Sequence, residues 1–109
     1  MTAKLFLLQR GSAAVLALAV AVHLATIVYA VRGGLTAGEI LERTAGNAGY
    51  LAFYLVFVAA VAIHAPIGLR NILREWLRWQ GRACDAALVV FAVALFVLGL
   101  RAVLALYLA

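Results

Sequence analysis

Three long apolar runs, separated by short polar segments, dominate the chain. They cover Gly11 to Val31, Tyr50 to Leu69 and Ala86 to Leu108. A helix needs about 20 consecutive apolar residues to cross a bilayer, and each run is of that order. The pattern therefore predicts a single domain over residues 1–109 that is all-α, an integral membrane protein with three transmembrane helices. We expect these helices at about residues 11–31, 50–72 and 86–108.

The polar segments carry signals for the helix ends. Residues 1–10 read as a short lead lying at the membrane interface. The Gly33-Gly34 pair is expected to end the first helix, and Thr36 to cap a short outer helix. Asn47 is expected to open the second long helix, and Asp85 to cap the third.

The composition favours lipid as the solvent of this chain. Hydrophobic residues make up 69% of the sequence and charged residues only 12%, too few to cover a soluble core of this size. The net charge of +5 comes from basic residues in short segments beside the apolar runs, which indicates membrane topology rather than nucleic-acid binding. Positive-inside counting places the N-terminus and the second loop in the cytoplasm, and the C-terminus outside. The single Cys84 excludes a disulfide framework within the chain.

Two histidines inside the apolar runs are the candidates for chemistry. A histidine in hydrocarbon is costly unless something binds it. Gly68 lies one turn from His64 on the same helix face, and Asn71 continues that face. The missing side chain of Gly68 leaves room for a wide, flat group such as haem, for which imidazole is an axial ligand. Pro66 is expected to kink the helix close to His64.

The other histidine, His23, lies in the first run. Counted at about 1.5 Å per residue, its depth differs from that of His64 by about 10 Å. The two imidazoles are therefore expected to serve two separate irons, each with its opposite ligand from another chain. The alternative for His23 is a hydrogen bond to Thr26 or to a neighbouring helix, and the small face of Ser12, Ala19 and Ala30 suits close packing by such a helix.

Two motifs resemble one family. The segment from His64 to Leu73, His-Ala-Pro-Ile-Gly-Leu-Arg-Asn-Ile-Leu, resembles the H-x-x-x-G-[IL]-R-H-[LM] motif of the cytochrome b membrane-anchor subunits of succinate dehydrogenase and fumarate reductase (complex II). Gln9-Arg10-Gly11-Ser12-Ala13 is similar to their H-R-x-[ST]-G signature. The chain departs from the family at Asn71 and Gln9, where histidines are usual, and at Phe6, where several members carry a quinone-site serine.

The resemblance implies a function and a set of site residues. His64 would be an axial ligand of haem b, with Ser12 and Gly68 in the same cofactor-binding set. Arg10 and Arg70 would pair with haem propionates or a quinone carbonyl; the alternative for both is a topology-setting arginine. His23 would ligate a second, distal haem, with Arg101 neutralising a propionate or reaching the outer headgroups.

The partners implied by the resemblance are a second transmembrane anchor subunit, an iron–sulfur subunit, a flavoprotein subunit and quinone. The chain would be a non-catalytic subunit of an oxidoreductase complex in the bacterial inner membrane. Three rival interpretations remain: a small proton-coupled transporter, a cofactor-free structural subunit, and another haem b anchor of the formate dehydrogenase or hydrogenase type. A proton-coupled transporter would need a carboxylate inside the membrane, and the apolar runs of this chain contain none. The other haem b anchors usually have four or more helices.

Overall fold

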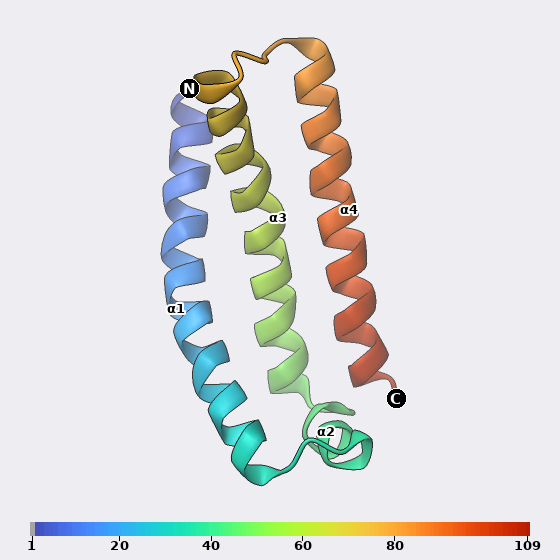
Figure 1. Cartoon of the computed structure of the whole chain (residues 1–109). Helices are drawn as coiled ribbons and strands as arrows, with labels where there is room; N and C mark the ends of the chain where they lie inside the picture. The colour runs from blue at the N-terminus through green and yellow to red at the C-terminus, as the bar shows by residue number, and fades with distance from the viewer. Residues whose placement is uncertain (1) are drawn as a thin grey trace.

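The computed structural model describes residues 2–109, which form four helices and no strand. The bounds are α1 Ala3–Gly33, α2 Ala37–Thr44, α3 Ala48–Trp76 and α4 Arg82–Tyr107 (Figure 1). The helices α1, α3 and α4 are each long and apolar enough to cross a membrane. The predicted all-α fold with three such helices is confirmed, and it indicates a multi-pass membrane protein.

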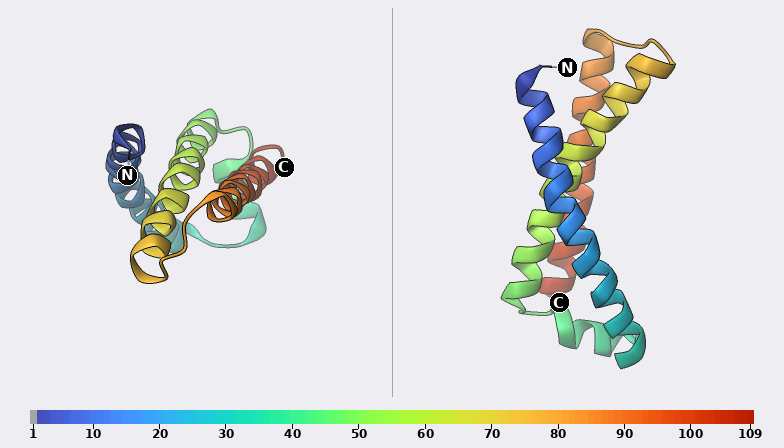
Figure 2. Two further views of the ribbon diagram at one scale, coloured as in Figure 1. Left: turned by 90° about the horizontal axis from the view of Figure 1, so that it is seen from above. Right: turned by 90° about the vertical axis from the view of Figure 1, so that its left-hand side faces the viewer.

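The helix α3 is the centre of the bundle. Both α1 and α4 pack on it, and a view along the bundle places it between them (Figure 2, left). The chain begins beside the α3–α4 connection and ends beside α2, at the opposite end of an elongated molecule of 47 × 23 × 22 Å (Figure 1). Every contact between α1 and α3 is therefore a contact between antiparallel helices. Which end faces the cytoplasm stays a prediction.

Most apolar side chains point outward. Leu18 on α1 is 74% exposed and Val90 on α4 is 68% exposed. The largest fully buried side chain in the described part is Cys84, in the first turn of α4. Water would penalise such a surface, whereas lipid tails are as apolar as the side chains themselves. Apolar side chains therefore cover the outside of the bundle, which agrees with the prediction of a membrane protein.

The long helices extend beyond their apolar runs. The helix α1 starts at Ala3, capped by the Thr2 hydroxyl on the Leu5 amide at 3.2 Å, so the separate lead expected over residues 1–10 is wrong for residues 3–10; residue 1 lies outside the described part. The prediction of Asp85 as a cap is also wrong, because α4 begins at Arg82 with Gly81 as N-cap. Residues at the ends of a membrane-spanning helix keep their backbone hydrogen bonds by remaining helical. Hydropathy alone therefore does not mark the residue at which the helix begins or ends.

The predicted caps around the short α2 are confirmed. Thr36 forms a capping box with Glu39, and the Asn47 side chain accepts a hydrogen bond from the Tyr50 amide at 3.0 Å to open α3. The Thr36 hydrogen bonds lower the pKa of the Glu39 carboxyl. At the same end, the Thr44 hydroxyl donates to the Leu106 carbonyl at 3.1 Å and ties α2 to the last turn of α4.

Close packing fixes the helices against one another. On α1, Ser12 and Ala19 are buried and Ala30 is partly buried, which confirms the prediction that this small face packs against a neighbouring helix. Between α3 and α4, a Cβ on Gly99 would lie 2.7 Å from Val58 Cγ1, so only glycine permits this approach. Small residues at both interfaces hold α3 close to its two neighbours.

Candidate functional site

The His64 imidazole lies at the interface of α3 with α1. Its Nδ1 atom is 3.4 Å from the hydroxyl oxygen of Ser12, which is 7% exposed. The Ser12 hydroxyl lies 3.1 Å from the Gln9 carbonyl, one turn earlier on α1, and donates to it. The three groups form a chain of hydrogen bonds from the backbone of α1 to the imidazole on α3.

The Ser12 hydroxyl lies on the Nδ1 side of the His64 ring, and the hydrogen-bond roles between them depend on the tautomer of the ring. When the hydroxyl donates its one proton to the Gln9 carbonyl, its oxygen accepts from the imidazole, which then carries the ring proton on Nδ1 and a lone pair on Nε2. No hydrogen bond to His64 Nε2 forms within residues 2–109. This is the state in which a histidine ligates a metal, since a ligating imidazole normally donates its other ring N–H to a second group.

The glycine notch beside His64 borders a second polar side chain. A Cβ on Gly68 would lie 3.4 Å from Gln9 Nε2, in ordinary van der Waals contact. The Gln9 Oε1 atom is buried and has no hydrogen-bond partner in the described chain. A buried amide oxygen without a donor is costly in a membrane protein. The Gln9 side chain of α1 thus lies against Gly68, on the helix face that carries His64.

The second histidine has a different environment. His23 Nδ1 lies 2.9 Å from the Tyr54 hydroxyl on α3, and its ring meets Tyr54 and Phe57 edge-on at centroid distances of 5.6 and 5.4 Å. Thr26 donates instead to the Val22 carbonyl at 2.8 Å. The hydrogen-bond partner of His23 is therefore on a neighbouring helix, one of the two expected alternatives. The Tyr54 hydroxyl can donate or accept here, so, as at His64, the hydrogen-bond roles depend on the tautomer of the ring.

A cavity of about 530 Å³ adjoins His23. Its wall is mainly apolar, from α3 and α4, and the phenol groups of Tyr50 and Tyr54 belong to it. The Tyr50 hydroxyl is already within 3.5 Å of the Val103 carbonyl. The cavity is large enough for part of a flat ligand, but its polar groups already bond one another or the backbone.

The two histidines lie farther apart in depth than the sequence suggested. Ser12 meets His64 and His23 meets Tyr54, so the depth difference is the span from Ser12 to His23 on α1, roughly 16 Å at the helical rise. The expected value was about 10 Å. The error came from judging the inner ends of two helices by hydropathy, whereas the contacts give their register directly. The conclusion that the two imidazoles do not share one iron still follows.

The arginines expected near the cofactor lie elsewhere in this chain. Arg10 is exposed, with its guanidinium 5.7 Å from the Phe6 ring centre, and two helical positions separate it from the buried face of Ser12. Two positions turn a side chain by roughly 200°, so Arg10 points away from His64. Arg70 pairs with Asp85 of α4 at 3.3 Å, and Arg101 is exposed on α4. The structure brings Ser12 and Gly68 to His64 and leaves these three arginines apart from it.

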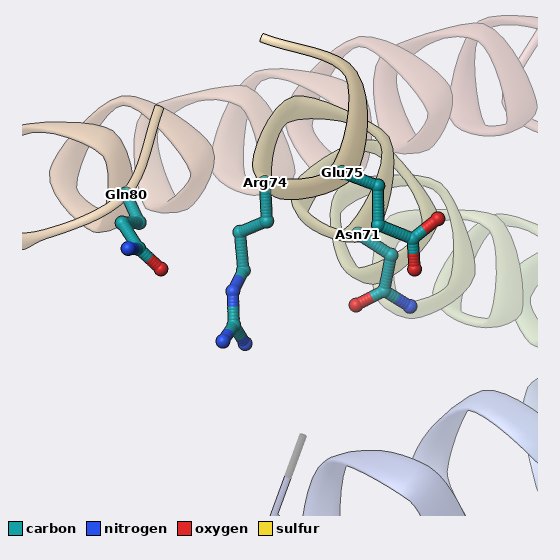
Figure 3. A pocket seen from close by; sticks show the side chains of 4 residues that line it. All are labelled: Asn71, Arg74, Glu75 and Gln80. Atoms are coloured by element: carbon teal, nitrogen blue, oxygen red, sulfur yellow. The ribbon is translucent and has the colours of Figure 1, made fainter. Parts of the chain in front are cut away.

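Two features were missed from the sequence. One is the pairing of Tyr54 with His23, which depends on the register of α1 against α3. The other feature is a polar pocket at the end of α3 nearest the N-terminus, formed by Asn71, Arg74, Glu75 and Gln80 (Figure 3). The helical spacing from His64 to Asn71 was the signal that could have connected the pocket to the histidine.

The described residues around His64 offer one imidazole, with Ser12 on its Nδ1 side and the Gln9 side chain against Gly68 one turn away. The described residues contain no group of three or more histidine, cysteine, aspartate or glutamate side chains close enough to hold a metal ion by themselves. If a haem bound here, His64 is the residue of this site that would hold it. Compared with protein-family models, curated proteins and solved structures, the chain matches none of them.

Proposed function

We propose that the chain is a haem b-binding membrane anchor subunit that mediates electron transfer between an iron–sulfur subunit and quinone, as in succinate dehydrogenase or fumarate reductase. The observation that carries the proposal is the environment of His64: an imidazole inside an apolar helix whose Nδ1 lies 3.4 Å from a buried hydroxyl. Nε2 has no hydrogen bond within residues 2–109. An intramembrane imidazole in this state is suited to ligate a metal and is costly to keep otherwise.

The residues of this chain would have distinct roles. His64 would hold the iron through Nε2, and Ser12 would orient the ring and increase its electron donation when it accepts a hydrogen bond from Nδ1–H. Gly68 would let the Gln9 side chain lie beside the ring, and the apolar side chains of α1 and α3 would exclude water. When bound, haem b supplies reversible one-electron chemistry, whose potential the ligand and its surroundings set. The second axial histidine, the quinone site and the hydrophilic subunits would belong to the complex, which we place in the bacterial inner membrane.

A cofactor-free structural subunit is the second candidate, and one observation favours it. Each intramembrane histidine has a hydrogen bond across the α1–α3 interface, His23 to Tyr54 and His64 to Ser12. Such bonds stabilise helix pairs in membranes by about 0.6–2 kcal/mol each. They account for Nδ1 of both rings but leave the buried, unpartnered Gln9 Oε1 beside Gly68 unexplained.

The proposal is tested with two histidine variants in the chain's native complex. His64→Ala is expected to abolish a haem b α-band in the reduced-minus-oxidised spectrum while the complex still assembles. His23→Ala is the matched control, because it removes an intramembrane imidazole that also has a cross-helix hydrogen bond. The His23→Ala variant is expected to keep the haem b α-band that is assigned to ligation by His64. An unchanged haem spectrum in the His64 variant would leave the structural candidate as the better account.

A further inference from the structure

An apolar groove runs along α3, away from the histidines. Its part nearest the N-terminus has a volume of about 410 Å³ and is lined by Leu8 of α1, Val89 of α4 and, from α3 between them, the buried Ile67. A second part of about 330 Å³ shares Ala62 and Ala92 with the first and continues along α3 and α4. The two parts form one continuous surface, which we call the α3 groove.

The length of the α3 groove matches one leaflet of a bilayer. It reaches from Arg70 to Ala59 on α3 and from Asp85 to Phe96 on α4. On either helix this is a span of eleven residues, or roughly 16 Å at the helical rise. Half of a hydrocarbon core of about 30 Å is about 15 Å. An extended acyl chain of a membrane lipid therefore fits the groove from one end to the other.

The α3 groove ends at an ion pair on the membrane boundary. Arg70 directly follows the second apolar run, and Asp85 directly precedes the third. Arg70 Nε donates to Asp85 Oδ1 at 3.3 Å, which uses one of the five N–H donors of the guanidinium. The Arg70 side chain is 26% exposed and that of Asp85 is 55% exposed, so each can take a further partner. The end of the groove thus offers one cation and one anion side by side.

This pair of charges discriminates among lipid head groups. A phosphate can accept charge-assisted hydrogen bonds from Arg70. Asp85 would repel a head group that is only anionic, such as that of phosphatidylglycerol, and choline has no N–H to donate to it. The ammonium of ethanolamine has three N–H donors, so phosphatidylethanolamine satisfies both charges at once. A partner helix in the groove would instead take the ion pair out of water, at a cost that the pair alone often does not repay.

We propose that the α3 groove binds one phosphatidylethanolamine molecule. An acyl chain lies along α3, the phosphate accepts from Arg70, and the ammonium donates to Asp85. The inference goes beyond the proposed function, because it needs no haem and does not involve His64. It also gives Arg70 a partner that is neither a propionate nor a quinone.

The test measures which phospholipid the full chain retains, purified with its native partners and stripped of lipid in detergent. The protein is incubated with equal amounts of phosphatidylethanolamine, phosphatidylcholine and phosphatidylglycerol that have the same acyl chains. Bound lipid per chain is then quantified by mass spectrometry after free lipid is removed. We expect one phosphatidylethanolamine per chain, enriched about tenfold over each competitor, the size of one hydrogen bond to a charged group.

Variants of the ion pair test the two head-group contacts separately. Arg70→Gln should lower bound phosphatidylethanolamine about tenfold, because the phosphate loses its cation. Asp85→Asn should abolish the preference and let phosphatidylglycerol bind equally well, because the guanidinium then has no carboxylate beside it. Arg82→Gln is the matched control, since it removes an exposed arginine from the same end of the molecule outside the groove, and it should bind lipid as the wild type does.

A third variant tests the acyl-chain contact. Ala62→Leu fills the groove where its two parts meet and should lower the binding of all three lipids. Ala25→Leu, at an exposed position of α1 outside the groove, should not.

Equal retention of the three lipids by the wild type would overturn the inference. Equal phosphatidylethanolamine in the Arg70→Gln and Arg82→Gln variants would do so as well. A quinone recovered in place of phospholipid, or no lipid retained because a partner helix fills the groove, would assign the groove to another occupant and also overturn it. Haem enters none of these measurements, so this inference and the proposed function can fail independently.

Discussion

Replacing Ser12 with alanine separates the role of its hydroxyl in ligation from any role in folding. When the hydroxyl donates to the Gln9 carbonyl of its own helix, its oxygen is the acceptor for a proton on Nδ1 of His64. Alanine removes the acceptor, so the proton is free to move to Nε2 and block the ligand position. The helix itself should not suffer, because alanine has the higher helix propensity. Ser12→Ala should therefore weaken haem binding without unfolding the chain.

The size of the effect follows from the geometry. Removing a group that orients a metal ligand typically costs 10–100-fold in metal affinity, which is about 1.4–2.7 kcal/mol. The Ser12 Oγ–His64 Nδ1 distance of 3.4 Å is long for a hydrogen bond, so the weaker end of that range applies. We expect a loss of about tenfold in haem affinity. The midpoint potential should rise, because an imidazole without this acceptor donates less electron density to the oxidised iron.

The assay is haem content of the purified complex at limiting haem supply, followed by redox titration of the α-band. Thr26→Ala is the control, since it removes a hydroxyl from the same helix that donates to the Val22 carbonyl and does not reach His64. Ser12→Thr should retain the wild-type values, because threonine keeps an accepting oxygen. Haem affinity and potential that are the same in Ser12→Ala as in Thr26→Ala would refute the claim that the Ser12 hydroxyl supports ligation by His64.

Two further predictions concern the scaffold. Gly99→Val should destabilise the bundle by about 1–3 kcal/mol through overpacking against Val58, measured as thermal unfolding in detergent, whereas Gly11→Val, at a position with nothing within 4 Å, should change it little. The start of α2 should be most stable above the ordinary pKa of a glutamate and weaken as the pH falls through the lowered pKa of Glu39, because the Thr36 hydrogen bonds favour the ionised carboxyl. Amide hydrogen exchange across α2 measures this, and Glu39→Gln should remove the pH dependence; equal pH dependence in both proteins would contradict it.

Much of the fold could be predicted from the sequence because its signals are local. Apolar runs give the three long helices, and single side chains give the caps at Thr36 and Asn47. Helix starts were the weak point. Residues 3–10 are helical because alanine, leucine, lysine, glutamine and arginine, which make up most of this segment, are all strong helix formers. Hydropathy reports where lipid ends, and the helix continues past that point.

Only part of the candidate site could be predicted from the sequence, because its geometry depends on the register of α1 against α3. Helical spacing places Gly68 beside His64 without any structure. Spacing on one helix does not show that Ser12 of α1 meets His64, nor that Tyr54 meets His23 at the opposite end. The same register turns Arg10 away from His64, although the two are at a similar depth. Contacts between helices have no local signature in a single sequence.

The central claim is that His64 ligates a haem b, and the most direct measurement is the haem b content of the purified native complex by the pyridine haemochrome method. The account predicts at least one haem b per copy of this chain in the wild type. It also predicts one fewer in His64→Ala at equal recovery of the complex. A complex without haem, or a haem count that does not change when His64 is replaced, would contradict it.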